Sequence, residues 1–360
     1  MTPVQHISEE AKKNFSQVWD KDFIIKLLNE KLGQYYADFK SVAELEVIPY
    51  KKHLGMTSAV FVANYKIKYL SQNKNIKKLE IFVSAHSDGS RQQAYRKNKF
   101  LFDHGFNQGN LRVTRPLFYL AENKAYFYQA ASGHRLFSFF RKNPGADLRP
   151  VFSLLAAWIK KLHSFRYQGA DFSWPTFTIA KMIPEPARFI NDFGRHDQPL
   201  GALAQRLYDK LAKVERNYQS VVALQLVYGD NHPENVIIES LETDHLEMID
   251  LTDIALGDPM LDLGTFLQQF DFMGHNYISR EKMNQAKIFF VESYFGQNLE
   301  QIDINYINRI NLYQSWTSLR TATFLFYMKD VQNPIIDLLD DGEKYLALAL
   351  DSNRKINLFK

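Results

Sequence analysis

The alternation of hydrophobic and polar residues changes character along the chain. Over residues 19–32 apolar side chains recur at helical spacing, and Gly33 follows as a stop signal. A charged stretch with an apolar stripe, residues 89–103, predicts a second helix. Around it, runs rich in β-branched and aromatic residues predict five strands, at 44–48, 59–69, 79–84, 116–120 and 125–128. We therefore expect an antiparallel five-stranded sheet with one inserted helix.

After residues 130–133, which are small and form a candidate hinge, the pattern becomes mainly helical. Residues 169–193 are rich in proline and aromatic residues, and we expect them to be irregular. The predicted fold class is α+β, with an N-terminal part of residues 1–130 and a helical C-terminal part of residues 131–360. Long helices are expected in four stretches of the second part: 151–163, 199–217, 262–295 and 303–330.

The composition suits a folded protein and excludes several kinds of site. The chain has 360 residues, 46% of them hydrophobic, which is enough for a sizeable core. Its net charge of +4 does not single out nucleic acid as a partner. The absence of cysteine excludes disulfides, thiolate zinc sites and cysteine nucleophiles. Because no secretory signal and no membrane-spanning stretch are recognisable, we expect a cytoplasmic protein without membrane contact.

One segment gathers polar residues of the types that serve phosphoryl transfer. A short apolar strand leads into Tyr-Gly-Asp-Asn-His-Pro-Glu-Asn at 228–235, and a later strand, 246–249, leads to Asp250. Transfer from ATP needs a carboxylate that orients the acceptor hydroxyl, and oxygen ligands that hold magnesium. Asp230 fits the first role, and Asn235 and Asp250 fit the second. A purely structural role is the alternative for Asp230 and Asn235, because both residue types favour turns.

This segment resembles the aminoglycoside phosphotransferase and choline kinase superfamily, which is related to the protein kinases. The family loop typically reads His-Gly-Asp-x-His-Pro-x-Asn, followed by a strand that ends Ile-Asp and then by Gly-Asp-Pro-x-x-Asp-Leu. The chain has YGDNHPEN, MID and GDPMLDLG in the same order, and its helix ending Leu162-His163 also looks like the family's. The resemblance covers roughly residues 45–330. It implies a two-lobed protein-kinase-like fold, with nucleotide bound by residues 1–130 and the catalytic loop and acceptor site in residues 131–360.

The resemblance also implies a reaction and a set of roles. MgATP, with GTP as a possible alternative, would phosphorylate a hydroxyl of a small aminoglycoside-, choline- or homoserine-like molecule. Asp230 would be the catalytic residue, with Asn235 and Asp250 as metal ligands. Tyr228 replaces the family's first histidine, which is a structural position. A kinase that phosphorylates protein side chains is a third alternative, and the absence of an Ala-Pro-Glu segment after Asp250 argues against it. By the same resemblance, Asp258 and Asp262 brace the loop. His232 is expected to be a hydrogen-bonding brace as well, and a ligand or a base is the alternative for it.

The N-terminal part departs from the family pattern. Relatives place a lysine on the third strand, paired with a glutamate on the next helix, to grip the nucleotide phosphates. Here Ser84 or His86 takes the lysine position, depending on register, and the helix has no glutamate. Either a cation of that helix reaches the phosphates instead, or nucleotide binding has weakened; a solvated basic face is the plain alternative. The helix carries four such cations: Arg91, Arg96, Lys97 and Lys99.

Further nucleotide contacts are expected from two short segments of the N-terminal part. The turn between the first two strands should cover the phosphates, because Gly55 permits close backbone approach and Thr57 and Ser58 can donate hydrogen bonds. An ordinary hairpin turn would have the same sequence. Gln129 and Ala131, which follow the last strand of the sheet, are expected to contact the nucleotide as well.

The acceptor class stays open among several patterns. An aromatic cage formed by Tyr313, Trp316 and Tyr327 would hold a quaternary ammonium group, although packing of these residues in the core explains them as well. An exposed Arg320 would instead suit an acceptor with a carboxylate or phosphate. An acidic pocket for an aminoglycoside, or a surface turn, would explain three acids near the C-terminus: Asp337, Asp340 and Asp341. The helix positions considered for the acceptor are Gln268, Gln269, Asp271, Tyr313, Trp316, Arg320 and Tyr327.

The sequence therefore predicts a magnesium- and ATP-dependent small-molecule kinase. The alternative is a pseudokinase, a binding or regulatory module that keeps the fold without efficient transfer. The missing lysine and glutamate favour that alternative, whereas the intact Asp230, Asn235 and Asp250 argue against it. No pattern in the sequence indicates an oligomeric state.

Overall fold

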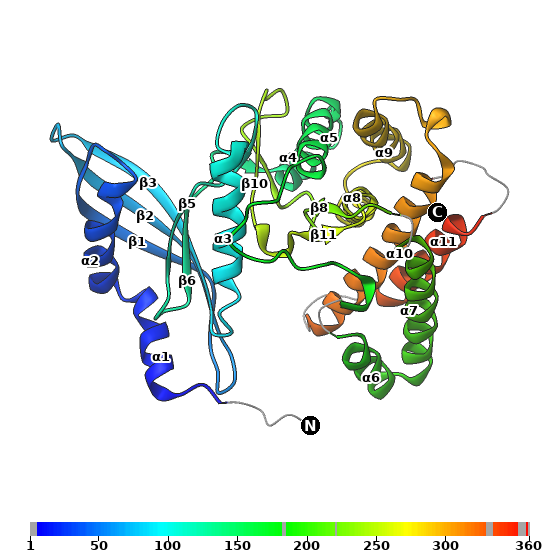
Figure 1. The fold of residues 1–360 in the computed structure, drawn as a ribbon, viewed down its shortest axis with the longest axis horizontal. Helices are drawn as coiled ribbons and strands as arrows, with labels where there is room; N and C mark the ends of the chain where they lie inside the picture. Colours follow the sequence, from blue (N-terminus) through cyan, green and yellow to red (C-terminus); the bar gives the residue numbers. More distant parts are fainter. Residues whose placement is uncertain (1–5, 182–184, 220–221, 329–333, 352–357, 359–360) are drawn as a thin grey trace. The chain divides into compact units, whose positions relative to one another are not determined.

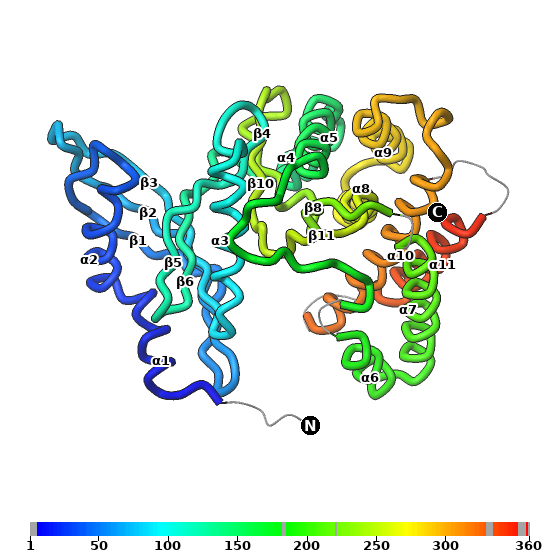
Figure 2. Tube along the Cα trace, in the orientation of Figure 1, coloured from blue at the N-terminus to red at the C-terminus, as the bar shows by residue number. Residues whose placement is uncertain are grey.

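The computed structural model contains two compact units (Figure 1). The first comprises the chain up to Ser132 together with Glu247–Thr252, and the second comprises Gly133–Leu246 and the chain from Asp253 onward. Figure 2 traces the chain through both. No helix in the described part of the chain is long and apolar enough to cross a membrane. The structure describes residues 6–181, 185–219, 222–328, 334–351 and 358.

The first unit is built on an antiparallel sheet with strand order β1-β2-β3-β6-β5. Its strands are β1 (Phe39–Leu54), β2 (Ala59–Ser71), β3 (Ile76–His86), β5 (Pro116–Leu120) and β6 (Ala125–Gln129). Its helices are α1 (Glu9–Ser16), α2 (Lys21–Lys31) and α3 (Arg91–Leu101). Two short strands are β4 (Leu111–Val113) and β10 (Leu246–Met248), of which Glu247 and Met248 belong to this unit. The predicted five-stranded sheet with its inserted helix is confirmed.

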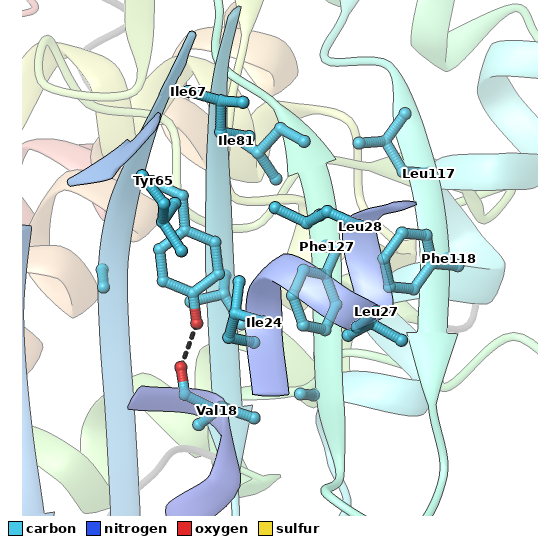
Figure 3. Packing of buried hydrophobic residues seen from close by; sticks show 14 of the residues in the cluster. Val18, Ile24, Leu27, Leu28, Tyr65, Ile67, Ile81, Leu117, Phe118 and Phe127 are labelled. Atoms are coloured by element: carbon cyan, nitrogen blue, oxygen red, sulfur yellow. Dashed lines mark hydrogen bonds between the residues drawn. The ribbon is translucent and has the colours of Figure 1, made fainter. Parts of the chain in front are cut away.

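One face of this sheet forms the core of the first unit with the two N-terminal helices. Tyr65 and Phe127 pack there against Ile24 and Leu28 of α2 (Figure 3). The Tyr65 hydroxyl donates a hydrogen bond to the Val18 carbonyl, which satisfies the one polar atom of that side chain. Since each fully buried apolar side chain contributes about 1.5–3 kcal/mol, this layer fixes the sheet firmly to α2.

The opposite face of the sheet is covered by α3. Because neighbouring residues of a strand point to opposite faces, Tyr126 projects away from the Phe127 core and its ring packs 5.5 Å from that of Tyr95 on α3. The same alternation in β3 puts Ser84 and His86 on the α3 side. The two positions at which the sequence expects the strand lysine therefore face the basic helix.

The second unit is mainly helical. Its helices are α4 (Leu136–Lys142), α5 (Arg149–His163), α6 (Pro186–His196), α7 (Gln198–Gln219), α8 (Met260–Gly274), α9 (Arg280–Phe295), α10 (Ile304–Tyr327) and α11 (Ile335–Ala349). Its short strands are β7 (His134–Arg135), β8 (Gln225–Val227), β9 (Val236–Ile238) and β11 (Ala255–Gly257). Helix α10 packs against α7, α8 and α11 (Figure 2), and β8 pairs with β11. The predicted α+β class, with a helical C-terminal part, is confirmed.

The structure corrects two of the predicted segments. Residues 169–193 are not irregular throughout, because α6 begins at Pro186, a residue suited to a first helical turn, and buries Phe189 and Phe193 one turn apart. Residues 262–295 do not form one helix: α8 ends at Gly274, and α9 starts afresh after Ser279, whose hydroxyl accepts from the backbone of the new helix. Helices α1 and α11 were not predicted.

Candidate active site

The loop that follows β8 makes its first turn at Gly229. The φ angle of this residue is +81°, and a Cβ atom here would lie 2.8 Å from the Asp253 carbonyl oxygen. Both facts restrict the position to glycine, because other residues are strained at positive φ and this close approach leaves no room for a side chain. The backbone turn that places Asp230 therefore requires a glycine directly before it.

Asp262, at the start of α8, holds this loop from below. Its carboxylate accepts hydrogen bonds from the backbone nitrogens of Tyr228 at 2.7 Å and Gly229 at 2.8 Å, and His163 Nε2 lies 2.9 Å from the same carboxylate. Asn231 donates to the Asp262 carbonyl at 3.1 Å. Asp262 is fully buried, so it braces the loop as expected. The partnership with His163, at the end of α5, was not predicted.

Asp258 has a different task from the one expected. It forms a 2.6 Å ion pair with Arg309 of α10 and accepts from the Met260 nitrogen at the start of α8. Burial raises the pKa of Asp258, and Arg309 offsets part of that rise. Among the described residues its hydrogen bonds do not reach the 228–235 loop. Asp258 therefore anchors α10 to the beginning of α8 instead of bracing the loop directly.

The Asp230 carboxylate is held from three directions. Arg320 Nη1 lies 2.9 Å from Oδ1, and Oδ2 lies 3.3 Å from both His232 Nε2 and Asn235 Nδ2. Burial alone would raise the pKa of Asp230, but Arg320 and His232 outweigh it and hold the pKa below its ordinary value. The side chain is still about one quarter exposed. Asp230 is therefore an ionised, oriented carboxylate that solvent can reach, and His232 has the bracing geometry expected of it.

Arg320 is engaged by protein acids. Besides Asp230, it pairs with Asp253 at 3.1 Å, and its guanidinium lies over the Trp316 ring at 5.4 Å. These two carboxylates outweigh the effect of burial and raise the pKa of Arg320, so it stays charged. In this arrangement Arg320 orients Asp230. The interpretation of Arg320 as an exposed anchor for an anionic acceptor is not supported.

The chemistry of Asn235 fits a metal ligand. Its side-chain nitrogen donates to the Asp230 carbonyl at 3.1 Å and to the Asp230 carboxylate at 3.3 Å. These bonds fix the amide plane and leave the amide oxygen, the atom that would bind magnesium, outside them. In the described part of the chain no three His, Cys, Asp or Glu side chains gather as a metal cage. Magnesium does not need one, since one or two protein ligands plus phosphate oxygens commonly hold it.

Asp250 belongs to the first unit, whereas Asp230 and Asn235 belong to the second. Its backbone is left-handed, with a φ angle of +52°, a conformation in which non-glycine residues are uncommon and are often functional. The Thr252 hydroxyl donates to its Oδ1 atom at 2.5 Å, and Arg91 Nη1 lies 3.9 Å from that oxygen. The side chain is 54% exposed. The carboxylate is therefore oriented, accessible and of the type that magnesium prefers.

The four cations of α3 divide into two pairs. Arg96 is exposed, and Lys99 forms an exposed ion pair with Asp103 at 2.6 Å, as a solvated face would. Lys97 is buried and donates to the Thr252 carbonyl at 2.7 Å. Arg91 donates to the Thr252 hydroxyl at 2.6 Å and lies 3.0 Å from His86 Nε2. The interpretation as a solvated face therefore fails for Arg91 and Lys97, which hold the segment that carries Asp250.

The comparisons with known proteins identify the family of the chain. The family model described as the phosphotransferase enzyme family matches residues 85–285, more than half of the chain. The chain belongs to this family. The match contains both the loop with Asp230 and the segment with Asp250. No curated protein matches the chain significantly.

Solved structures of small-molecule kinases share the fold of this phosphotransferase family member. A choline kinase from Cryptosporidium parvum aligns with a TM-score of 0.60 at 13% identity, covering 91% of this chain and 95% of its own. An amicoumacin kinase in complex with AMP-PNP and Ca²⁺ aligns with a TM-score of 0.59 at 12% identity, covering 98% of each chain. An ADP-bound aminoglycoside phosphotransferase aligns with a TM-score of 0.51 at 13% identity, covering 91% and 97%. At these identities the likeness establishes the fold alone.

The positions at which the sequence predicts nucleotide contacts all lie in the first unit. The Gly55 nitrogen donates to the Ser58 carbonyl at 2.8 Å and closes the turn between β1 and β2, in which Thr57 and Ser58 are exposed. Gln129 Oε1 accepts from the Tyr36 hydroxyl at 2.9 Å, and Ala131 follows in a partly buried segment. Burial, assisted by nearby Arg91, lowers the pKa of His86 to about 4. Neither His86 nor the buried Ser84 therefore supplies a cation near neutral pH.

Most of the helix positions considered for the acceptor serve the interior instead. Asp271 pairs with Lys287 at 2.6 Å and accepts from Tyr345 at 2.8 Å, and Gln269 donates to Thr321 at 2.7 Å. Gln268, Tyr313 and Trp316 are buried, which favours a core stripe over an aromatic cage, although Tyr327 is 38% exposed. The C-terminal acids do not form a surface turn; they lie in helix α11: Asp337, Asp340 and Asp341.

Proposed function

We propose that this protein transfers the γ-phosphoryl group of a magnesium-bound nucleoside triphosphate, ATP or GTP, to a hydroxyl group of a small molecule. The observation that carries the proposal is the loop after β8, where Asp230 and Asn235 lie 3.3 Å apart on a backbone braced by Asp262. Membership of the phosphotransferase enzyme family supports it. So do the solved relatives that contain AMP-PNP or ADP.

In the proposed reaction the acceptor oxygen forms a bond to the γ-phosphorus while the bond from that phosphorus to the β–γ bridging oxygen breaks, which releases the nucleoside diphosphate. The acceptor proton passes to the Asp230 carboxylate. A carboxylate of low pKa is a weak base, but the loose transition state of phosphoryl transfer demands orientation of the hydroxyl more than early proton removal. Magnesium, when bound, would neutralise phosphate charge, with Asn235 and Asp250 as its protein ligands.

The proposal is tested with Asp230→Asn, which keeps the size of the side chain and removes its charge. We expect phosphoryl transfer to fall by about 10³-fold or more while the affinity for ATP and the melting temperature stay near the wild-type values. Transfer is measured as ADP release with a panel of alcohols that includes kanamycin, choline and homoserine. Asp209→Asn, an exposed acid of α7, is the matched control. Wild-type rates in the Asp230 variant would refute the assignment.

A pseudokinase is the second candidate function, and one observation favours it. Strand β3 offers Ser84 and His86 where the family has a lysine, and burial lowers the pKa of His86 to about 4. Thermal unfolding with ATP and magnesium separates the two functions. A ligand at 100 times its Kd stabilises a protein by about 2.7 kcal/mol, so a kinase should show a clear rise in melting temperature at millimolar ATP. No rise would favour the pseudokinase.

A further inference from the structure

The buried part of β3 lacks a permanent cation, but the next element supplies one. Lys77 and Lys78 lie at the exposed start of the strand, and Lys77 is paired with Asp38 at 2.5 Å. A short turn at Gly89 then reverses the chain, and α3 begins with Arg91, five residues after His86. The Arg91 guanidinium returns to the end of β3, where Nη2 lies 3.0 Å from His86 Nε2. Helix α3 thus places the cation Arg91 beside the uncharged end of strand β3.

The charge of Arg91 is incompletely matched by the protein. Its side chain is only 15% exposed, yet its close partners are the neutral imidazole of His86 and the neutral hydroxyl of Thr252. The nearest acid, Asp250, is 3.9 Å away, and the Nε atom has no hydrogen-bond partner among the described residues. Arg309 and Arg320 differ from Arg91, because each has a carboxylate within 2.6–3.1 Å. A partly buried cation whose close partners are neutral is suited to an anionic ligand.

Contacts with the segment around Thr252 hold Arg91 close to Asp250, the predicted metal ligand. Lys97, two turns along α3, is buried and donates to the Thr252 carbonyl at 2.7 Å, so the helix grips the same segment at two points. Thr252 in turn donates to Asp250 at 2.5 Å. The first unit therefore carries, on its own, a cation and a carboxylate 3.9 Å apart. A magnesium-bound phosphate chain needs such a pair, a carboxylate for the metal and a cation for the phosphate oxygens.

We propose that Arg91 is the phosphate-binding cation of this protein and takes the place of the strand lysine of its relatives. This proposal rests on the proposed function, since it assumes a nucleoside triphosphate as the ligand. The guanidinium presents several donors in one plane and can bind two phosphate oxygens at once, which a lysine cannot do in the same way. Thr252 and His86 hold Arg91 in place of the helix glutamate that pairs with the lysine in relatives. Thr252 and His86 give it neutral partners that a phosphate can displace.

The test measures nucleotide affinity by isothermal titration calorimetry in the presence of magnesium. The variant Arg91→Met is compared with Arg96→Met, which removes the same charge from an exposed position of the same helix. We expect Arg91→Met to weaken ATP binding by about tenfold or more and to leave adenosine, which lacks phosphates, within about threefold of wild type. Arg96→Met should bind both ligands like wild type, and Arg91→Lys should recover part of the loss for ATP.

A merely structural role of Arg91 would give a different pattern. If Arg91 only fastens Thr252, then Thr252→Val should weaken ATP binding as much as Arg91→Met does, and adenosine and ATP should weaken together. Either of those results, or unchanged ATP affinity in a folded Arg91→Met protein, would overturn the proposal. Far-ultraviolet circular dichroism and the melting temperature establish that each variant is folded. If the wild-type protein itself binds no nucleotide, the proposed function falls with it, which distinguishes that failure from a failure of Arg91 alone.

Discussion

Two basic side chains hold Asp230. One lies far from it in sequence, and the other lies on the same loop. Arg320 comes from α10, and His232 is two residues away. Together they hold the pKa of Asp230 below the ordinary value despite its partial burial. The carboxylate is consequently ionised throughout the neutral range and fixed in orientation. This state suits a group that aligns a hydroxyl and receives its proton late.

Removing Arg320 should shift the acid side of the activity profile. In Arg320→Met the burial of Asp230 is no longer opposed by the guanidinium, so the pKa of Asp230 should rise. Activity requires the ionised carboxylate and is lost as the pH falls through its pKa. The acid limb of kcat/KM should therefore move to higher pH, by about one unit or more, while Arg320→Lys should move it less. An unshifted limb would show that Arg320 does not control Asp230.

The sequence predicts the residues that follow recognisable strands at regular spacing. It does not predict contacts between residues that lie far apart in the chain. Asp230, Asn235 and Asp250 follow strands at characteristic intervals, so the order of residues along the chain is enough to predict them as candidate site residues. The pairing of Arg320 with Asp230 joins residues 90 positions apart, and Arg91 meets Thr252 across 161 positions. Nothing local in the sequence marks either contact. A basic helix could be recognised, but not which of its cations turns inward.

At the scale of elements, the ends of two helices support the loop after β8. Asp262 in the first turn of α8 accepts two backbone hydrogen bonds from the loop, and His163 in the last turn of α5 orients that carboxylate. His163 is itself held by the Tyr294 hydroxyl at 2.8 Å. By fixing the loop, Asp262 and His163 keep Asp230 in position without contacting a ligand themselves.

Asp262→Asn should destabilise the protein and lower activity together. The amide cannot accept both backbone hydrogen bonds and also pair with His163, so at least one buried polar group loses its partner, at a cost of about 1–3 kcal/mol. Urea unfolding measures the loss of stability, and kcat reports displacement of Asp230. The exposed Asp209→Asn should change neither quantity. A stable Asp262→Asn variant with normal kcat would contradict the bracing role.

The predictability of the elements follows the strength of their local patterns. The five strands and α5, α7 and α10 show clear periodicity and were predicted, although β1 and β3 extend beyond the predicted ends because they continue pairing with β2. Helix α6 was missed because the prolines around it suggested a loop, whereas Pro186 in fact starts the helix. The break after α8 depends on a cap at Ser279, a weak signal within an apolar stretch.

At the scale of the whole molecule, one buried acid of the second unit should affect stability. Glu215 of α7 is 3% exposed, accepts from the Ile179 nitrogen at 2.9 Å and lies 3.4 Å from the Tyr313 hydroxyl. Burial raises its pKa to about 7, with a small further contribution from Asp258, while the two hydrogen bonds oppose the rise. The folded protein therefore binds a proton that the unfolded chain, with an ordinary glutamate, releases near pH 4.5.

This proton makes stability fall as the pH rises from about 4.5 through 7. The cost of ionising Glu215 in the folded state is absent below pH 4.5 and complete above pH 7, and it amounts to about 3 kcal/mol. Glu215→Gln should remove that part of the pH dependence. Urea unfolding at pH 5 and pH 8 measures it, with the exposed Glu300→Gln as control. An equal pH dependence in Glu215→Gln and wild type would refute the assignment.

The first unit is not continuous in the chain, because Glu247–Thr252 belongs to it and the preceding 114 residues from Gly133 to Leu246 do not. During synthesis on the ribosome, Arg91 and Lys97 must therefore wait for Thr252 until more than 150 later residues have been made. A fragment that ends at Ser132 would leave these two cations without that partner. We therefore expect the N-terminal unit to complete its folding late in translation. We also expect that recombination which exchanges only the N-terminal segment of the chain would separate Asp250 from the helix that holds it.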